Sequence, residues 1–224
     1  MRLETFIPCA ANRLALAAAK AVSASPGIAY NPLLLFGGTG LGKSHLLQAI
    51  AQDLPRLHTG GKVLYLTADE FASQVRGSTS FAQFQDLQTL ILDDIHRLAA
   101  LPEAQEILLQ LFHSFYNEQR QLVLSSLVAP KMLSGFSEPL ASRFRWGLVV
   151  ELEPPSVQAR ADLLRRKATA CHLSLPDDVY ALLAESLGPN IRELEGVLLR
   201  LQSHAALLAQ PIDTTLARGV LRDY

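Results

Sequence analysis

The chain has 224 residues, a formal net charge of −1 and a hydrophobic fraction of 49%. This length suits one domain with a smaller appendage and a substantial apolar core, and the nearly neutral charge provides no overall field that would attract a polyanion. No apolar run approaches the length that crosses a bilayer, and the N-terminus lacks the layout of a signal peptide. The composition therefore predicts a cytoplasmic protein without a membrane partner, whose contacts with nucleic acid would have to be local.

Cysteine and histidine form no pattern typical of a metal centre. Cys9 and Cys171 lie far apart in the sequence, without the spacing of zinc ligands or of a disulfide framework. The six histidines are scattered along the chain. We therefore expect buried thiols, and histidines that lie at the surface or are satisfied within the core.

Five short apolar runs recur along the first two thirds of the chain, with helical stretches between them. They occupy residues 33–36, 63–66, 90–92, 122–124 and 148–152. Such runs are typical of strands buried on both faces, which in parallel sheets are joined by crossover helices. The sequence predicts a three-layer α/β domain built on a five-stranded parallel sheet.

The first run leads into a glycine-rich segment, residues 37–44, which reads G-G-T-G-L-G-K-S. It fits G-x-x-x-x-G-K-[ST], and a helix is expected at 44–54, ended by Pro55 and a turn at Gly60 and Gly61. Strand, glycine-rich turn and helix together indicate a phosphate-binding loop, where backbone N–H groups and the helix N-terminus surround a polyphosphate. The alternative is a glycine-rich turn that matches by chance. That alternative does not explain why all three parts coincide.

In this interpretation the loop binds the nucleotide, the Lys43 ammonium reaches the outer phosphates, and the Ser44 hydroxyl holds Mg²⁺. The residues predicted to contact the nucleotide from this loop are Gly38, Thr39, Gly40, Leu41, Gly42, Lys43, Ser44 and His45.

Two carboxylates, Asp93 and Asp94, follow the third run directly. They are expected at the C-terminal edge of the sheet, where open α/β sheets bind ligands. Downstream of a phosphate loop, this pattern is typical of a Walker B element, although an Asp-Asp pair can also be a plain acidic turn. Asp93 would act on the Mg²⁺ shell, and Asp94 would orient the attacking water.

The sequence changes character at residues 153–156, E-P-P-S, after which only helical patterns follow. We place a domain boundary there, between a nucleotide-binding core at 1–153 and a small all-helical lid at 154–224. Helices are expected at 157–170, from a start within 175–178, and at 191–208, where Asn190 can cap the helix with Glu193 three residues on. A basic cluster on the first of these helices is either a solvated face or a DNA-facing stripe: Arg160, Arg165, Arg166 and Lys167.

Together these segments resemble the AAA+ ATPases, and specifically the family of the bacterial replication initiator DnaA. The similar stretches, in chain order, are A-Y-N-P-L at 29–33 before the loop, L-D-D-I at 92–95, S-R-F at 142–144 with W-G-L at 146–148, E-P-P at 153–155 and N-I-R-E-L-E-G at 190–196. The resemblance covers nearly the whole chain. It implies an AAA+ P-loop NTPase core with a helical lid, which binds ATP or ADP with Mg²⁺.

The resemblance also implies roles for residues that would otherwise be unremarkable. Arg143 is similar to the arginine finger of the family, which reaches the γ-phosphate held by a neighbouring subunit. A guanidinium suits this role because it stays charged and can donate to two phosphate oxygens. Arg192 resembles the sensor 2 arginine of the lid, which contacts phosphates in its own subunit. Ile7, Pro8 and Asn12 resemble part of the segment around adenine. Without the resemblance, each arginine would be read as a surface salt-bridge partner.

Several features depart from the family pattern. Leu127 stands where the family usually has an acidic sensor 1 residue after the fourth strand, with Ser126 beside it as a substitute hydrogen-bonding group, and Pro139 replaces a second interface arginine. The segment at 72–88 is short, with Arg76 as its one basic residue, so weak or no direct DNA binding is expected. The chain ends at Tyr224, where initiators continue into a helix-turn-helix domain; if the chain is complete, origin recognition lies elsewhere.

The sequence therefore favours a DnaA-like nucleotide switch in the control of replication initiation, either the ATPase region of an initiator or a short Hda-like relative. Its catalytic residues would be Lys43, Asp94 and Arg143, with turnover weak alone or dependent on a heteromeric assembly. Expected partners are a DnaA-type subunit or a second copy at the Arg143 face, and helicase or clamp within the replication machinery. A DnaC-like helicase loader and a nucleotide-binding scaffold without turnover remain alternatives.

Overall fold

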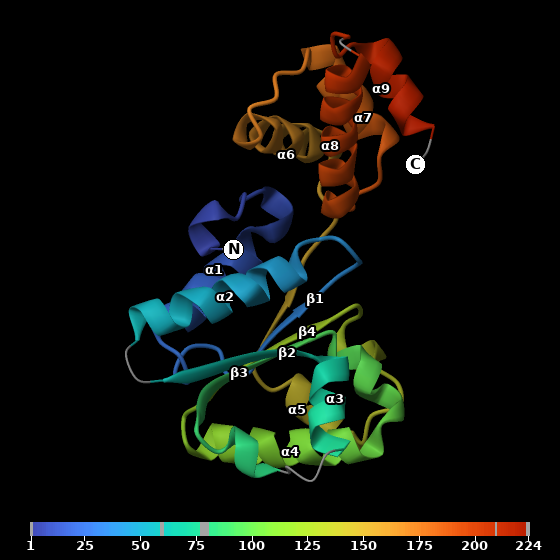
Figure 1. Cartoon of the computed structure of the whole chain (residues 1–224). Coiled ribbons are helices and arrows are strands. Elements are labelled where there is room, and N and C mark those ends of the chain that lie inside the picture. The colour runs from blue at the N-terminus through green and yellow to red at the C-terminus, as the bar shows by residue number, and fades with distance from the viewer. Residues whose placement is uncertain (1, 59–60, 77–80, 209, 223–224) are drawn as a thin grey trace. The chain divides into compact units, whose positions relative to one another are not determined.

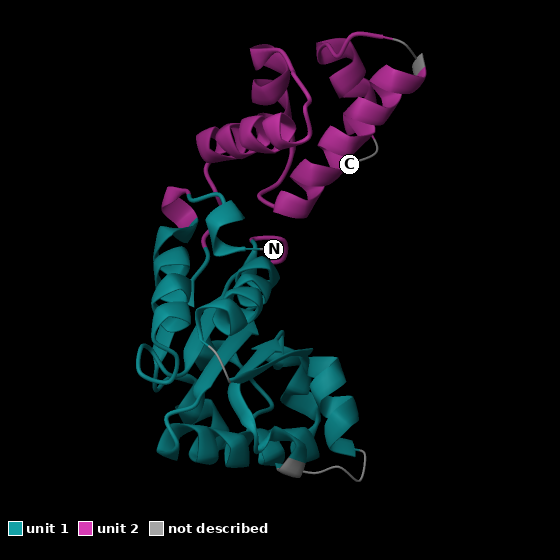
Figure 2. Ribbon diagram, turned by 60° about the vertical axis from the view of Figure 1, so that its left-hand side comes forward, with its two compact units in different colours: residues 1–8, 12–38, 42–152 teal, residues 9–11, 39–41, 153–224 magenta. Residues whose placement is uncertain are grey.

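The structure, a computed structural model, describes residues 2–58, 61–76, 81–208 and 210–222 (Figure 1). The expected turn at Gly60, part of the short segment at 72–88 and the last two residues lie outside the described residues. Internal contacts group residues 1–8, 12–38 and 42–152 into one compact unit and residues 9–11, 39–41 and 153–224 into another (Figure 2). Residues 39–41 of the glycine-rich loop thus group with the helical unit, whereas the expected boundary at 153 assigned the whole loop to the nucleotide-binding core.

The first unit is built on a sheet of five strands, all of which pair in parallel. The strands are β1 (Leu33–Phe36), β2 (Lys62–Thr67), β3 (Leu87–Asp93), β4 (Gln121–Ser126) and β5 (Leu148–Glu151), in the order β2-β3-β4-β1-β5. Every residue of the central strand β4 is buried. The predicted five-stranded parallel sheet is confirmed, and β3 begins three residues earlier than its apolar run because Leu87 and Thr89 also face the interior.

Helices cover both faces of this sheet. Helices α1 (Arg13–Ala24) and α2 (Lys43–Leu57) lie on one face, and α3 (Ala68–Arg76), α4 (Pro102–Asn117) and α5 (Glu138–Phe144) on the other (Figure 1). The core beneath α3, α4 and α5 contains four fully buried phenylalanines: Phe71, Phe84, Phe115 and Phe144. This gives the expected three-layer α/β architecture.

Helix α2 differs from its expected end at Leu54. It continues through Pro55 to Leu57. A proline removes one backbone donor, but this one stands in the last turn with its side chain exposed, and the His58 N–H still donates to the Leu54 carbonyl at 2.9 Å. The expectation was wrong because a single lost bond near a helix end is tolerated.

The second unit consists mainly of α6 (Val157–Ala170), α7 (Asp177–Ser186), α8 (Ile191–Leu208) and α9 (Thr214–Leu221), packed around Leu164, Leu183 and Leu201. Side chains cap the starts of α6 and α9: Ser156 Oγ accepts from the Ala159 N–H at 3.2 Å, and an Asp213 carboxylate oxygen accepts from the Leu216 N–H at 2.8 Å. Helices α6 and α8 have the predicted bounds. Among the described residues, no helix is long and apolar enough to span a bilayer.

Candidate functional site: a phosphate loop beside paired carboxylates

The glycine-rich loop begins where β1 ends and leads directly into α2. Gly42 precedes the helix with φ +98°, in the left-handed region that favours glycine, and a Cβ there would lie 3.3 Å from the ring of Phe6. Gly37 is equally restricted, since a Cβ would lie 2.4 Å from the Leu152 carbonyl oxygen. These two glycines are therefore required by backbone conformation and close packing, and the loop they shape ends at the N-terminus of a helix, where anions bind.

Lys43, the first residue of α2, turns its side chain back over the loop. Only 5% of the residue is exposed, and its Nζ donates to the carbonyl oxygens of Gly37 and Gly38, both at 2.7 Å. Ser44 follows in the same helical turn and is half-buried. The ring of His45 packs edge-on against Phe6, with 5.3 Å between centroids. The ammonium thus lies at the loop, with carbonyl oxygens in the role that phosphate oxygens would take.

Asp93 ends β3 with only 3% of its surface exposed, between donors from the two neighbouring strands. The Tyr65 hydroxyl of β2 donates to one carboxylate oxygen at 2.7 Å, and the Ser125 hydroxyl of β4 donates to the other. Burial and the bond to Asp93 raise the pKa of Tyr65 well above its ordinary value. The phenol is therefore a neutral donor at physiological pH, and the carboxylate is oriented from both sides.

Asp94 has a left-handed backbone, with φ +59° and ψ +46°. This conformation is uncommon for a residue with a side chain and is found where surrounding contacts enforce it, often at functional sites. Here the Asp94 N–H donates to Ser125 Oγ at 2.8 Å. One serine hydroxyl therefore holds both residues of the carboxylate pair, a role that sequence reasoning missed because it depends on the pairing of β3 with β4.

His96, which sequence reasoning also missed, joins the carboxylate segment to the end of β4. Its Nδ1 accepts from the Leu127 N–H at 3.4 Å. Burial lowers the pKa of His96, and the charge of Lys43 acts in the same direction, while Asp94 opposes the shift. Leu127 occupies the expected sensor 1 position, so a neutral imidazole approaches the place where an acid was expected. Ser126 instead accepts from the Val128 N–H at 3.3 Å.

The tip of the loop and the start of α8 belong to the second unit. The Ile191 N–H donates to the Gly40 carbonyl at 2.9 Å, and Gly40 has φ +72°, with Asn190 Oδ1 only 1.8 Å from where a Cβ would lie. Asn190 caps α8 as predicted: its Oδ1 accepts from the Arg192 N–H at 3.1 Å, and its amide donates to Glu193 at 2.9 Å. Exposed Arg192 therefore lies in the helical turn that holds the loop tip.

The remaining predicted residues lie in two further places. Near the N-terminus, the Asn12 side-chain amide donates to the Ile7 carbonyl at 3.1 Å, and Pro8 is exposed between them. Arg143 lies on α5 and is joined to Trp146 and His113 rather than to the phosphate loop. The structure thus brings Ile7 and Asn12 together, and it gives Arg143 a specific local environment.

Three of the four cations of the basic cluster on α6 make contacts within the helical unit, and the fourth, Arg166, is exposed. Arg160 donates to the carbonyls of Pro155 and Ala184, Arg165 pairs with Asp162 and Asp177, and Lys167 pairs with Glu195. These contacts favour a structural, solvated face over a DNA-facing stripe.

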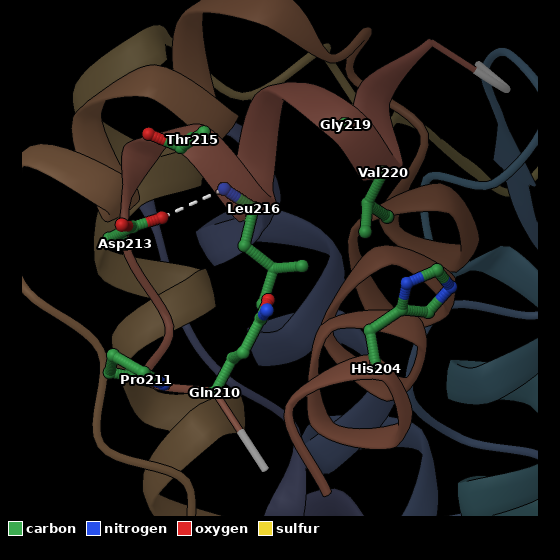
Figure 3. Close-up of a pocket in the computed structure, with 8 residues that line it drawn as sticks. All are labelled: His204, Gln210, Pro211, Asp213, Thr215, Leu216, Gly219 and Val220. Carbon is green, nitrogen blue, oxygen red and sulfur yellow. Dashed lines mark hydrogen bonds between the residues drawn. The ribbon is translucent and has the colours of Figure 1, made fainter. Parts of the chain in front are cut away.

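A cavity of about 590 Å³ lies between the end of α8 and α9 (Figure 3). His204 faces it from α8, and Asp213, whose carboxylate caps α9, lines it from the other side. Its lining contains no lysine or arginine. This cavity therefore lacks the chemistry that binds a polyphosphate.

A parallel sheet of this order, with a phosphate loop after β1, a carboxylate pair after β3 and a helical unit after β5, defines an AAA+ P-loop NTPase domain. Residues 1–151 match the family model described as the bacterial DnaA ATPase domain. The chain therefore belongs to the DnaA family of ATPase domains.

Similar curated proteins include initiators from several bacteria. The chromosomal replication initiator protein DnaA of Leifsonia xyli subsp. xyli is 37% identical over 227 residues, which cover 98% of this chain and 48% of that protein. DnaA of Cutibacterium acnes is 39% identical over 227 residues, covering 98% of this chain and 45% of that protein. The chain spans about half the length of these relatives.

Solved structures agree with this family. Domain III of Thermotoga maritima DnaA superposes with a TM-score of 0.92 at 30% identity, covering 100% of this chain and 96% of that one. AMPPCP-bound DnaA from Aquifex aeolicus has a TM-score of 0.85 at 31% identity, covering 91% of this chain and 65% of that one. A RuvB mutant of Thermotoga maritima, at 20% identity and a TM-score of 0.74 over 99% of this chain and 72% of that one, shares the fold alone.

Proposed function

We propose that this chain is an ATP-dependent switch in the control of chromosome replication initiation, which binds ATP with Mg²⁺ and turns it over slowly alone or in an assembly. The observation that carries the proposal is the buried Lys43 ammonium over the glycine-rich loop, together with the Asp93 carboxylate that Tyr65 and Ser125 orient. A similar DnaA holds the ATP analogue AMPPCP.

The donor set suits a magnesium nucleotide. The residues that would hold the phosphates are the loop residues 38–45, above all Lys43, and those that would hold Mg²⁺ are Ser44 and Asp93. Among the described residues, no group of three or more His, Cys, Asp or Glu side chains could hold a metal ion. Magnesium commonly takes one or two protein ligands and completes its shell with phosphate oxygens and water, and when bound it supplies charge neutralisation at the phosphates.

The side chains divide the remaining work. Lys43 exchanges its two carbonyl acceptors for phosphate oxygens, which are stronger acceptors because they are charged. Tyr65 and Ser125 keep the Asp93 carboxylate oriented, and Asp94, held in its left-handed conformation by Ser125, positions water.

The helical unit supplies the switch. Arg192 is exposed in the first turn of α8, and the same turn is bonded to the loop tip through Ile191 and Gly40. Phosphate contacts made by Arg192 would therefore act on the conformation of the segment that also holds the loop tip. In this way the nucleotide state would be linked to the helical unit.

The partner expected at the Arg143 face is a DnaA-type subunit or a second copy of this chain, with helicase or clamp as further contacts. A similar DnaA has been solved with AMPPCP and single-stranded DNA, but three of the four cations of the α6 cluster are engaged internally here. We therefore propose weak direct DNA binding by this chain, and a cytoplasmic location.

Titration calorimetry with ATP and Mg²⁺ tests the site. Replacement of Lys43 by alanine should weaken ATP binding by roughly 10- to 100-fold, because a charged hydrogen bond contributes about 1.5–3 kcal/mol. The matched control is Lys62→Ala, since Lys62 is an exposed lysine that pairs with Asp86. Binding undiminished by Lys43→Ala would contradict the assignment.

A nucleotide-binding scaffold without turnover is the second candidate, favoured by Leu127 at the sensor 1 position. Steady-state hydrolysis, measured alone and with a DnaA-type partner, separates the two. Binding without turnover in both conditions favours the scaffold, and turnover only in the mixture favours a switch completed by a neighbour. The family match favours either one over a helicase loader.

A further inference from the structure

Two exposed aromatic side chains stack beside Arg143. Tyr116 of α4 and Trp146, two residues after α5, are 53% and 51% exposed, and their rings lie 4.5 Å apart at an angle of 22°. We call this pair the aromatic platform. The guanidinium carbon of Arg143 lies 4.1 Å from the centre of the Trp146 ring. The aromatic platform thus places large apolar surface in solvent and a cation directly over it.

His113 fixes the guanidinium from another direction. One terminal nitrogen of Arg143 lies 3.2 Å from His113 Nε2. Arginine can only donate, so His113 Nε2 is the acceptor of this contact. His113 lies three residues before Tyr116 on α4, so the two contacts come from the same helix face.

The platform rests on a rigid base. Phe144, which follows Arg143, is fully buried and packs edge-on against Phe112 and Phe136, at 5.9 and 5.3 Å between centroids. Gly147, which follows Trp146, has no room for a side chain, because a Cβ would lie 1.9 Å from the Pro32 carbonyl oxygen. The backbone on either side of the Arg143 and Trp146 contact is therefore held in place.

This arrangement restricts a side chain that is otherwise flexible. A free arginine side chain samples many rotamers and loses conformational entropy when it binds. A contact with the face of an indole uses the charge rather than the N–H donors, and five such donors are available on a guanidinium, one of them toward His113. Arg143 is thus ordered in advance, with donors left for an anion.

We propose that Trp146, backed by Tyr116, is a positioning residue that orients Arg143 toward the triphosphate of a second DnaA-type subunit. The inference rests on the proposed function, since it assumes that Arg143 acts on a neighbour's nucleotide. Charge complementarity favours this partner, because an ordered guanidinium surrounded by apolar side chains is complementary to a polyphosphate bound at the surface of another protein. Aromatic and arginine side chains are also enriched where protein interfaces have their strongest contacts.

A complementation assay isolates this role. An acceptor chain carrying Arg143→Ala can hold ATP, and a donor chain carrying Lys43→Ala can offer Arg143, so hydrolysis in the mixture depends on the donor. The donor is titrated with Trp146 intact or replaced by alanine or phenylalanine. Ile28→Ala in the donor is the matched control, since Ile28 is an exposed apolar residue outside the platform.

A positioning role predicts a specific pattern. The Trp146→Ala donor should lower the maximal rate at saturating donor by roughly 10- to 100-fold, as expected for a misplaced catalytic group, while the half-saturating donor concentration changes little. The Trp146→Phe donor should restore most of the rate, and Ile28→Ala should leave it unchanged. Circular dichroism checks folding. If Trp146→Ala does not fold, Tyr116→Ala replaces it and should lower the maximal rate in the same way.

Fluorescence supplies an independent measurement, because Trp146 is the one tryptophan of the sequence. With Trp146→Phe added to the acceptor, all tryptophan emission comes from the donor, and it should shift when the acceptor holds ATP. An unchanged maximal rate with the Trp146→Ala donor, or a change in half-saturating concentration alone, would overturn the inference. So would absence of turnover in every mixture, whereas full activity of the Arg143→Ala chain alone would instead refute the trans role of Arg143.

Discussion

Replacement of Ser125 by alanine removes the hydroxyl that joins β4 to both carboxylate residues. In the intact protein this fully buried hydroxyl donates to the Asp93 carboxylate and accepts from the Asp94 N–H. After the change, Asp93 keeps Tyr65 as a donor. The Asp94 N–H loses its acceptor, and the left-handed conformation of Asp94 loses the hydrogen bond that supports it.

The expected loss can be worked from these two bonds. A hydrogen bond to a charged group contributes about 1.5–3 kcal/mol, and a buried donor left unsatisfied costs about 1–3 kcal/mol. Asp94 is half-buried, so water recovers part of the second term. We expect the free energy of unfolding to fall by about 2–4 kcal/mol, which for a chain of this size lowers Tm by roughly 5–15 °C.

Thermal unfolding and ATP titration together measure the effect. Because Asp93 is proposed to act on Mg²⁺, Ser125→Ala should also reduce the gain in ATP affinity that Mg²⁺ provides over EDTA. Ser126→Ala is the matched control: Ser126 is also fully buried on β4, but its hydroxyl accepts from the Val128 N–H, so a loss of about 1 kcal/mol or less is expected. A wild-type Tm for Ser125→Ala, or equal losses in both variants, would refute the reasoning.

Two further predictions concern stability. Arg120 is buried and donates to the carbonyls of Phe84, Gln85 and Leu87. Arg120→Ala should lower the free energy of urea unfolding by about 3–5 kcal/mol, because these carbonyls lose hydrogen bonds to a charged donor that contribute about 1.5–3 kcal/mol each. Arg120→Lys should recover only part of this loss because lysine lacks the fork of donors, and a costless Arg120→Lys would contradict the prediction. The second prediction concerns His96, whose pKa is lowered in the folded state, so the unfolded chain binds a proton more readily. The contribution of His96 to the free energy of unfolding is therefore fully present above about pH 6.5 and falls as the pH drops below that value. His96→Asn keeps an acceptor for the Leu127 N–H without titrating, and it should flatten this dependence in urea unfolding between pH 7.5 and 5.5; an unchanged slope would show that another group is responsible.

What the sequence could predict was local. The loop, the carboxylate pair and the Asn190 cap are each consecutive or nearly consecutive residues, so spacing alone identifies them. Tyr65 and Ser125 could not be assigned in this way, because their role depends on β2 and β4 flanking β3. A useful signal was nonetheless present: once β3 and β4 pair with Leu92 opposite Leu124, the next residue on β4 must approach Asp93.

Strand order also explains why the end of β4 matters more than its motif suggests. β4 lies between β3, which carries the carboxylates, and β1, which leads into the phosphate loop. The last two residues of β4 each bond to one of these motifs. Ser125 Oγ accepts from the Asp94 N–H of the carboxylate pair, and the Ser126 carbonyl accepts from the Gly37 N–H of the loop at 3.3 Å. A displacement of this strand end would therefore move both motifs together. With an apolar Leu127 next in the chain, β4 contributes to the site through these hydrogen bonds rather than through a charge, so variants at Ser125 should affect the carboxylates directly and the loop only through a displacement of the strand end.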